Sequence, residues 1–302
     1  MRRAALGLTA FSLVIGVGCR PKIEPVETPG RSAAEAAPGV EVCWIESRGK
    51  LGFTASALLV HHQSGGSILI DAGNSSNFDE EIEPYEGSTK RWLATFPGAL
   101  QPKQPLDELL ADAGVDPASL RAVVPTHAHL DHLGGVLDLP ELPVWVTQEE
   151  AALIERGRET VTEEVIPAHA EAVVDQLELI SFEDQPYEIF ERHADLFGDG
   201  SVVVVPMPGH TPGSVGVFVT LTDGRRVFHV GDAVNDRKQV EQLRGRTWAM
   251  QRTDMDRPAA NVVVARLHAL AEQDPSLLLL PAHERGAWTA VFEAPAESCP
   301  RS

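Results

Sequence analysis

Basic residues are scarce in this chain. Lys and Arg together number 25 against 44 Asp and Glu over 302 residues, which gives a formal net charge of -19 at pH 7. Such an excess of negative charge repels phosphate backbones, so nucleic acid is not expected as a partner. The same field disfavours polyanionic ligands, although a bound pair of divalent cations would reverse the potential locally. Charge therefore excludes one class of partner and says little about any particular site.

Long hydrophobic runs are absent as well. The apolar run from Ala4 to Val17 is too short to span a membrane comfortably. It follows Met1-Arg2-Arg3 and precedes Gly18-Cys19, which is the layout of a bacterial export signal. We therefore expect an exported protein that works in the periplasm or on a membrane of a bacterium.

The end of this signal resembles the lipobox of bacterial lipoproteins, because Cys19 follows small residues. In that case Cys19 would carry a diacylglyceryl anchor, and this lipid would be the only membrane contact. Gly16 departs from the aliphatic residue that is usual three positions before such a Cys. An ordinary cleaved signal peptide is the alternative.

Cysteine is rare, with three in the whole chain. Besides Cys19 there are Cys43, at the start of the folded part, and Cys299, near its end. In an oxidising compartment these two could pair and tie the ends of the fold together, and two free thiols are the alternative. Neither lies in a metal-binding spacing, so cysteine is not expected to ligate a metal.

No short tandem repeat and no break in composition past residue 40 divides the chain. Residues 20–39 are rich in Pro, Ala and Glu without hydrophobic periodicity, which predicts a flexible tether. We expect an export signal at residues 1–19, this tether, and one folded domain at residues 40–302. Whether the domain is a monomer or forms a homodimer is left open by the sequence.

Short β-like runs alternate with helical patterns along the domain. Strands are predicted at residues 40–46, 56–62, 67–71, 121–125, 143–147, 176–182, 201–207, 214–220, 225–231 and 277–281. Helices are predicted at residues 105–114, 148–156, 237–243 and 257–272. Residues 74–104 show neither pattern and are too long for a simple connection, so we interpret them as a lid or pocket wall, or else as a surface insertion. Two strand-rich halves flanked by helices favour an α/β fold with two packed sheets and helices outside.

A cluster of histidines follows the predicted strand at residues 121–125. His127, His129 and Asp131 alternate, so their side chains point to one side of an extended segment. His132 joins them only if the chain turns at Asp131. Imidazole and carboxylate are ligands that zinc and neighbouring first-row ions prefer, and a polar turn with chance histidines is the weaker interpretation. Four ligands in one loop exceed the three that one catalytic ion typically takes, so a second ion is implied.

Further candidate ligands follow later predicted strands in the same way. His210 lies among turn formers in the segment Pro208-Gly209-His210-Thr211-Pro212-Gly213, Asp232 follows the run at 225–231, and His283 follows the run at 277–281. Sites in α/β folds commonly form where strands end, so we expect these side chains to meet. Each one alone could be an ordinary loop residue, and the combination carries the prediction.

Together these motifs resemble those of the metallo-β-lactamase superfamily over roughly residues 40–290. The positions that match the pattern are Asp71, in Ile70-Asp71-Ala72-Gly73, and His127, His129, Asp131, His132, His210, Asp232 and His283. The resemblance implies a four-layer αββα sandwich. It further implies one ion on His127, His129 and His210, a second ion on Asp131, His132 and His283, and a bridge between them by Asp232. Asp71 would lie behind the ligands and orient them or their loops.

The resemblance also implies a chemistry. Two cations about 3.5–4 Å apart can hold a hydroxide between them and make it a nucleophile at neutral pH. We expect hydrolysis of an ester-like bond in a small molecule, with Asp131 also carrying a proton to the leaving group. Zinc is the first expectation for the metal, and Mn, Fe or Co suit the same ligands.

The residue at the bridging position indicates which branch of the superfamily this chain resembles. True β-lactamases generally carry Cys or Ser where this chain has Asp232, so antibiotic hydrolysis is not expected as the main activity. The pattern is most similar to N-acyl homoserine lactonases and methyl parathion hydrolase-like enzymes. Many homoserine lactonases place a Tyr three residues beyond the bridging Asp, where this chain has Asn235. Tyr187 could take over only if the fold carries it inward.

Other functions remain as alternatives. Persulfide dioxygenases share the fold and most of the motif but use one iron held by two His and one Asp. A β-lactamase and a metal-binding lipoprotein without catalytic activity are further alternatives. The other histidines, His61, His62, His193, His229 and His268, are expected to be structural. Trp92, Phe96 and Trp248 are expected in the core, with an acyl pocket as the alternative.

Overall fold

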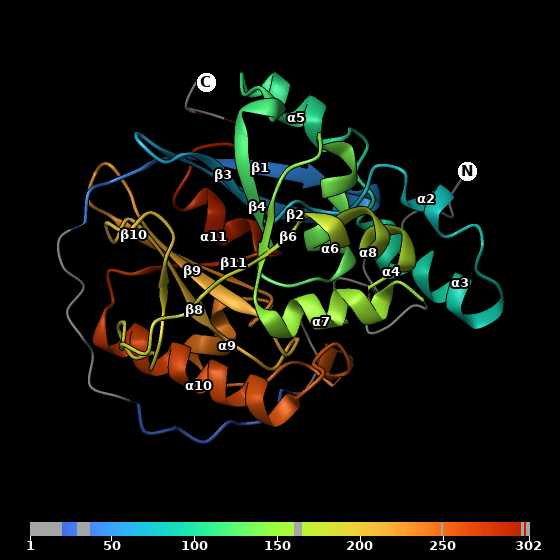
Figure 1. Cartoon of the computed structure of the whole chain (residues 1–302). Helices are drawn as coiled ribbons and strands as arrows, with labels where there is room; N and C mark the ends of the chain where they lie inside the picture. The colour runs from blue at the N-terminus through green and yellow to red at the C-terminus, as the bar shows by residue number, and fades with distance from the viewer. Residues whose placement is uncertain (1–19, 29–36, 160–164, 249, 297–298, 300–302) are drawn as a thin grey trace, which may run out of the picture.

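The computed structural model of the chain describes residues 20–28, 37–159, 165–248, 250–296 and 299 (Figure 1). The predicted export signal, including Cys19, lies outside the described residues. None of the described helices is long and apolar enough to cross a membrane.

Two mixed sheets form the centre of the described chain. The first has the strand order β1-β2-β3-β4-β5-β6 and the second has the order β11-β10-β9-β8-β7. The strands of the first sheet are β1 (Glu41–Arg48), β2 (Thr54–His62), β3 (Gly66–Ile70), β4 (Leu120–Val124), β5 (Val144–Val146) and β6 (Leu177–Leu179). Those of the second sheet are β7 (Ala194–Asp195), β8 (Val202–Pro206), β9 (Val215–Thr220), β10 (Arg226–Gly231) and β11 (Leu278–Pro281).

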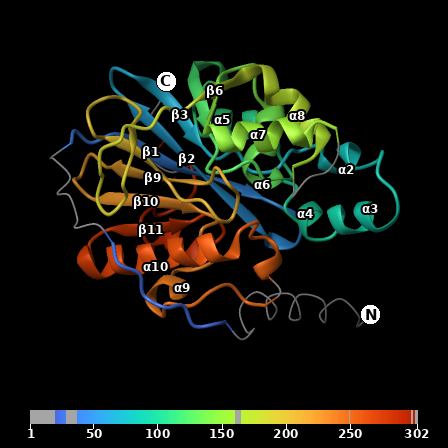
Figure 2. The same cartoon turned by 60° about the horizontal axis from the view of Figure 1, so that its bottom comes forward.

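Helices cover the outer faces of both sheets. On the side of the first sheet lie α5 (Leu106–Asp112), α6 (Leu130–Leu133), α7 (Gln148–Gly157) and α8 (Pro167–Val173). On the side of the second sheet lie α9 (Arg237–Glu241) and α10 (Arg257–Gln273), and α11 (Arg285–Thr289) follows β11. Figures 1 and 2 show the resulting order of helices, sheet, sheet and helices. This is the four-layer αββα sandwich that the motifs predict.

Alternation along the strands explains the layers. In β1, Cys43 and Ile45 face a core shared with α5 and α7, whereas Trp44 between them faces the second sheet. In β8, Val204 faces the core between the sheets, and its neighbours Val203 and Val205 pack toward α10. Both faces of each sheet are therefore buried, which requires strands rich in Val, Ile and Leu rather than strands with one polar face.

The stretch at residues 74–104 contains three short helices joined by turns, so the prediction that it lacks a helical pattern is wrong. It contains α2 (Phe78–Glu81), α3 (Gly87–Leu93) and α4 (Phe96–Ala99). Each helix is at most seven residues long, too short for a helical period to stand out from the sequence. Phe78 and Leu93 are fully buried in a small core with Leu130 of α6, so the stretch packs beside the histidine loop.

Part of the predicted tether lies against the domain. The backbone N–H of Ile23 donates to Leu243 O at 3.1 Å, and Pro21 O accepts from Gly245 N at 2.9 Å. Arg20 is ion-paired with Asp236, just before α9. Residues 20–23 therefore pack against the chain on either side of α9, while the division of the chain into signal, tether and domain stays a prediction.

Cys43 and Cys299 form a disulfide, so the structure decides between the two alternatives that the sequence left open. The bond joins β1 to the last described residue across a sequence separation of 256.

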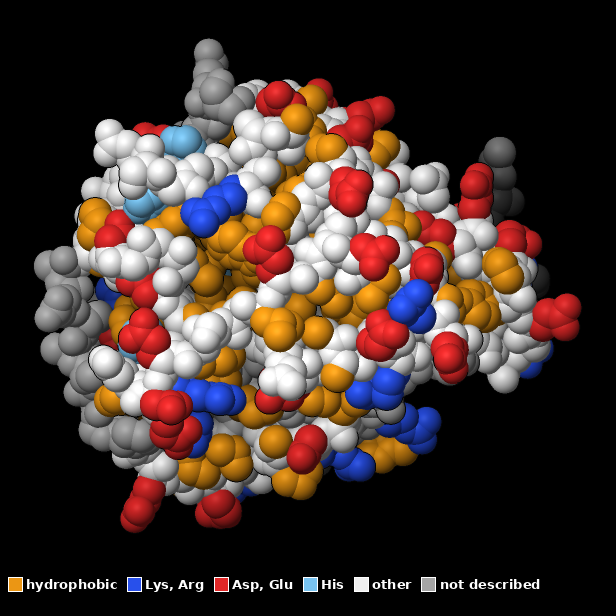
Figure 3. Space-filling model, in the orientation of Figure 1, with side chains coloured by type: hydrophobic (Ala, Val, Ile, Leu, Met, Phe, Trp, Pro, Cys, Tyr) orange, Lys and Arg blue, Asp and Glu red, His pale blue; other side chains and the backbone are white. Residues whose placement is uncertain are grey.

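Acidic side chains are scattered over the face of the molecule in Figure 3 rather than gathered over one element. The negative net charge is therefore spread across this surface.

Candidate metal centre

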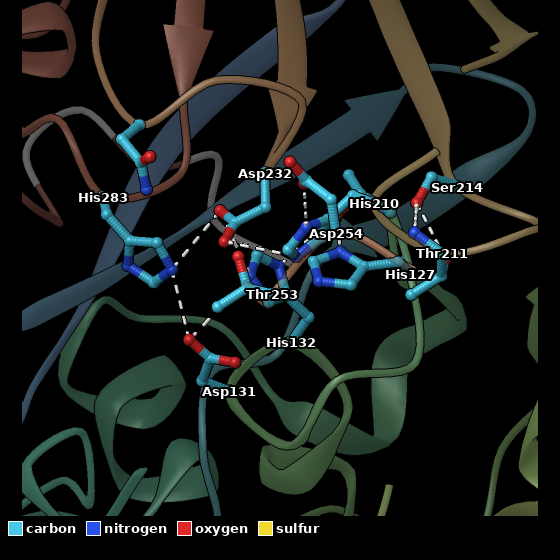
Figure 4. A network of polar contacts seen from close by, with 12 residues as sticks. His127, Asp131, His132, His210, Thr211, Ser214, Asp232, Thr253, Asp254 and His283 are labelled. Carbon is cyan, nitrogen blue, oxygen red and sulfur yellow. Dashed lines mark hydrogen bonds and ion pairs between the residues drawn. The ribbon is translucent and has the colours of Figure 1, made fainter. Parts of the chain in front are cut away.

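The candidate ligands come from loops that start where strands end. Strands β3 and β4 are parallel, and so are β10 and β11. β9 runs antiparallel to both β8 and β10. Strands β8 and β10 therefore run in the same direction and end on the same side of their sheet. The loops after β4, β8, β10 and β11 therefore open at one edge of the sandwich and carry the predicted ligands there (Figure 4).

The two sheets are joined directly at this edge. The backbone N–H of Val215 in β9 donates to Thr126 O, in the loop after β4, at 2.9 Å. Gly231, at the end of β10, has a φ of +50° and touches Thr126 so closely that a Cβ there would lie 2.5 Å from Thr126 Oγ1. Glycine is needed at this position because the loops holding His127 and Asp232 must approach each other.

The predicted ligands form two groups that meet at Asp232. His127, His129 and His210 have ligand atoms within 4.8 Å of one another, and so do Asp131, His132 and His283. His132 reaches the second group because the chain turns into α6 at Leu130, as its place in the sequence requires. A third group, made of His127, His132 and Asp232, links the other two.

Asp232 lies between the two groups, with one carboxylate oxygen toward each. Its Oδ2 is 3.6 Å from Nε2 of His210. Its Oδ1 is 3.6 Å from Nε2 of His132 and 3.4 Å from Nε2 of His283. Nε2 of His283 is also 3.1 Å from Asp131 Oδ2. This arrangement is the one that a carboxylate shared by two cations needs.

Backing groups hold the rings so that Nε2 faces the centre. Nδ1 of His132 lies 2.9 Å from Asp71 Oδ2, and Nδ1 of His210 lies 3.1 Å from Asp254 Oδ1. Nδ1 of His283 lies 2.9 Å from the carbonyl oxygen of Thr54. A hydrogen bond at Nδ1 fixes the ring orientation and leaves Nε2 as the ligand atom.

Several buried side-chain atoms at this centre lack a hydrogen-bond partner among the described residues, and they fit a bound cation. Nε2 of His127, His132 and His210 and Oδ1 of Asp232 are buried and have no hydrogen-bond partner among the described residues. Buried polar atoms are rarely left unsatisfied, because each costs free energy. Here several converge on one place, and their chemistry suits a divalent first-row ion.

The three-histidine group favours neutral imidazoles. Burial, followed by the neighbouring histidines, holds the pKa of His127 and of His129 well below the usual 6.5. Burial and then Arg246 lower the pKa of His210, against the opposing effect of Asp254. Neutral imidazole is the ligating form, so these side chains need lose no proton to bind an ion.

The second group is charged. Burial opposes protonation of His132, but Asp71 and Asp131 outweigh it and raise its pKa to about 10. Burial likewise opposes protonation of His283, and Asp232 and Asp131 raise its pKa well above the usual range. The same contacts lower the pKa of the Asp131 and Asp232 carboxyls despite their burial. The carboxylates thus attract positive charge into this group.

Asp71 lies behind the ligands, where the resemblance places it. It has a positive φ of 62° and is buried, and its Oδ1 accepts from the backbone N–H of Thr126 at 2.6 Å. Its Oδ2 is close to His132 Nδ1 and lies 3.3 Å from Nε2 of His229. Burial raises the pKa of this carboxyl, but His132 and His229 more than offset it, so Asp71 is ionised. His229 is therefore a buried structural group beneath the centre, as expected.

Two residues at the centre have no motif in the sequence. Asp254 contacts His210, as described above, and Arg246 donates through Nε to Asp254 Oδ1 at 2.8 Å. Arg246 also donates to the carbonyl oxygen of Asp232 and, at 2.7 Å, to Asn235 Oδ1. The segment between α9 and α10 thus supports the candidate ligands His210 and Asp232. The irregular path of this segment could not be predicted from its composition or from a hydrophobic period.

Some predicted pocket residues lie elsewhere. Tyr187 packs against Phe218 on the outer face of the second sheet, and its hydroxyl accepts from Arg226, so the fold does not carry it inward. Trp92 and Trp248 are 42% and 71% exposed, so the prediction that they belong to the core is wrong. The side chain of Phe96 lies outside what the structure describes.

Residues 50–283 match the family described as the Metallo-beta-lactamase superfamily, and the chain belongs to this superfamily. A probable metallo-hydrolase of Mycobacterium tuberculosis is 29% identical over 251 residues, which cover 76% of this chain and 75% of the relative. The N-acyl homoserine lactonase AttM of Rhizobium radiobacter is 22% identical over 231 residues, covering 76% of this chain and 82% of the relative. The chain is accordingly a metal-dependent hydrolase.

Solved structures agree on the fold. An N-acyl homoserine lactone hydrolase with N-hexanoyl-L-homoserine at its catalytic metal centre has a TM-score of 0.60 at 18% identity, covering 86% of this chain and 99% of that one. The dizinc quorum-quenching lactonase AidC has a TM-score of 0.52 at 15% identity, covering 87% and 90%. At such identities the likeness shows the fold alone.

Proposed function

We propose that the protein is a two-metal hydrolase that opens an ester-like bond in a small molecule, with a lactone as the first candidate. The observation that carries the proposal is the position of Asp232, whose two oxygens face two separate groups of buried ligands. A single catalytic ion would need about three protein ligands, and the seven residues present suit two ions sharing a carboxylate.

Two divalent ions, once bound, would supply a nucleophile from water at neutral pH and polarise the substrate oxygen. The chain's own residues then hold and move protons. Asp131 lies 3.1 Å from His283 Nε2 at the side of the centre and is 6% exposed. This position supports the proposal that it passes a proton to the leaving oxygen. Asp71 and Asp254 keep the ligand rings in position during turnover.

The lactone assignment is supported by the relatives that carry that name. One curated relative is an N-acyl homoserine lactonase, and similar structures are lactonases. Asn235 stands where the family pattern often has a Tyr, and its side-chain oxygen Oδ1 accepts a hydrogen bond from Arg246. This departure favours a lactone or ester that does not depend on a phenol donor, and aryl esters and phosphotriesters belong in the same test.

We also propose that the protein works outside the cytoplasm. The apolar run followed by Cys19 and the disulfide between Cys43 and Cys299 both suit an oxidising compartment. Fractionation of cells that produce the full chain tests this proposal. Recovery of the protein in the cytosol with its signal intact would overturn it.

The activity is tested by assaying zinc-loaded protein on acyl homoserine lactones, aryl esters, phosphotriesters and nitrocefin, with Asp232→Ala as the inactive control. Turnover of a lactone or ester, lost in the control, is the expected result. Turnover of nitrocefin alone would make the protein a β-lactamase. The dioxygenase alternative is tested on the protein as purified, before metal exchange, by metal analysis and by oxygen uptake on a persulfide. One iron per chain with oxygen uptake and no hydrolysis would assign it to the dioxygenases instead.

A further inference from the structure

Glu150 is a buried carboxylate without a place in the ligand set. It lies in the first turn of α7 and is 1% exposed, although Glu149 beside it is exposed. Burying a carboxylate costs free energy unless hydrogen bonds compensate for the lost water. The chain keeps one here, where a nonpolar residue would continue the buried face formed by Leu153 and Ile154.

Three donors from two different loops compensate for this burial. Oε1 of Glu150 accepts from the backbone N–H of Ala128 at 2.6 Å. Oε2 accepts from the hydroxyl of Thr211 at 2.8 Å and from the backbone N–H of Gly213 at 3.0 Å. Ala128 lies between His127 and His129, and Thr211 directly follows His210. The Glu150 side chain thus hydrogen-bonds to residues that directly neighbour all three histidines of one group.

The close fit of α7 against the His210 loop adds to this clamp. Thr147, the N-cap of α7, donates its hydroxyl to the carbonyl oxygen of Gly213 at 3.0 Å. A Cβ on Gly213 would lie 2.2 Å from Thr147 Oγ1 and 2.5 Å from the Glu150 nitrogen, so only glycine permits this approach. Ser214 Oγ, 2.7 Å from Thr211 Oγ1, completes the orientation of that hydroxyl.

We propose that Glu150 is a positioning residue that sets the spacing of the His127-His129 and His210 loops, and so controls the affinity of the three-histidine group for its ion. The inference rests on the proposed metal centre. Among the described residues, Glu150 does not hydrogen-bond to Asp131, His132 or His283, so the effect is expected to be confined to one of the two ions.

The donor pattern makes Glu150→Gln a sharp test. All three partners donate, so both oxygens must accept, and an amide can offer an oxygen to only one side. Its NH2 group would face either Ala128 N–H or the Thr211 and Gly213 donors. The shape of the side chain stays the same, so the change isolates hydrogen bonding from packing. Glu149→Gln on the same helix turn is the matched control.

The experiment titrates each purified protein, first stripped of metal, with zinc in competition with a chromophoric chelator. Wild type and Glu149→Gln are expected to bind two ions tightly. Glu150→Gln is expected to bind one of them about 10- to 100-fold more weakly and to keep the other. Equal zinc affinities in Glu150→Gln and wild type, with lower stability of the metal-free variant only, would overturn the inference.

A second pair of variants decides the matter if Glu150→Gln does not fold. Thr211→Val removes one donor at nearly constant volume, and Thr211→Ser keeps the hydroxyl. The valine variant is expected to weaken the same ion, and the serine variant to bind as wild type does. Equal zinc binding by both would overturn the inference. If wild type itself binds no zinc, the proposed metal centre fails rather than the clamp alone.

Discussion

Single residues give the two halves of the candidate metal centre different charges. Burial and mutual repulsion keep His127 and His129 neutral, whereas Asp131 and Asp232 hold positive charge at His283. The first half is therefore shaped by loop geometry and the second by carboxylate charge. Loss of a carboxylate should accordingly harm the second half through charge, with little change in the fold.

Asp131→Asn tests the role of the carboxylate that is placed to carry a proton. The amide cannot accept and release a proton, so turnover at saturating zinc is expected to fall by about 10²- to 10⁴-fold. Kinetics and metal content are measured on the same preparation, and exposed Asp112→Asn is the control. Retention of both ions with near-normal turnover would show that Asp131 moves no proton.

Asp254→Asn tests the support behind His210. The substitution weakens the acceptor for His210 Nδ1 and leaves the buried Arg246 guanidinium without its carboxylate. We expect zinc affinity to drop about tenfold or more and the apparent melting temperature to fall. Calorimetry with and without zinc measures both effects, and exposed Asp223→Asn should change neither. An unchanged affinity would mean that Asp254 only stabilises the loop.

The grouping of the candidate ligands could be predicted from the sequence because they follow strands in spaced motifs, as His127, His129 and Asp131 do. Asp254 and Arg246 could not, because their contacts depend on an irregular segment without a period. Glu150 left a weak signal: it lies three and four residues before Leu153 and Ile154, on the buried face of a helix. Glu149 shares only the spacing to Leu153, whereas Glu150 has a helical spacing to both buried residues.

At the scale of elements, short helices brace the histidine loop from the side. Glu81, the last residue of α2, lies 2.7 Å through Oε2 from Nε2 of His169 in α8 and also accepts from the Ser75 hydroxyl. A Cβ on Gly134, two residues beyond His132, would lie 2.6 Å from the His169 ring. The α2–α8 contact therefore fits closely around the turn that follows the ligands.

This contact predicts a dependence of stability on pH. Burial alone would raise the pKa of the Glu81 carboxyl, but His169 and Ser75 lower it below the usual 4.5. The ionised form therefore stabilises the fold above pH 4.5, and this contribution disappears as the pH falls through the lowered pKa. We expect Glu81→Gln to be less stable than wild type at pH 7 and the difference to shrink in acid.

Urea unfolding of both metal-free proteins at pH 7, 5 and 4 measures this difference. Part of the Glu81 side chain reaches solvent, so the effect is expected to be modest. A difference that stays constant down to pH 4 would show that Glu81 acts through packing and not through its charge.

Element boundaries show where sequence patterns stop. The strand predicted at residues 176–182 pairs only as β6 (Leu177–Leu179), because its partner β5 offers three residues, Val144–Val146. The central strands β8 and β10 end within one residue of their predicted ends. A continuous valine run delimits β8, and the turn residues Gly231 and Asp232 mark the end of β10. The length of the neighbouring strand depends on the tertiary fold and not on the local sequence. The ends of a strand at the edge of the sheet are therefore harder to predict than those of a central strand.

At the scale of the whole molecule, the disulfide ties the two ends of the domain together. Cys43 is fully buried in β1, and the chain near Cys299 also bonds to β1 through Ala296 N and Trp44 O at 2.7 Å. Closing a loop that spans 256 residues restricts the unfolded chain strongly. The bond is therefore expected to matter for stability and not for the chemistry at the centre.

Replacing both cysteines with Ala is expected to lower the free energy of unfolding by about 2–5 kcal/mol while kcat stays near wild type. Denaturant unfolding with and without reductant measures the effect. Wild type in reductant should resemble the double variant, and the double variant should be insensitive to reductant. A wild type whose unfolding ignores reductant would contradict the prediction.

The central claim is that two ions share one centre through Asp232. The measurement that tests it most directly is the number of zinc ions bound per chain in wild type and in His283→Ala, determined by titration of metal-free protein and checked by elemental analysis. The account predicts two ions in wild type and one in His283→Ala, since the three-histidine group stays intact. One ion in both proteins would contradict it and leave a mononuclear enzyme.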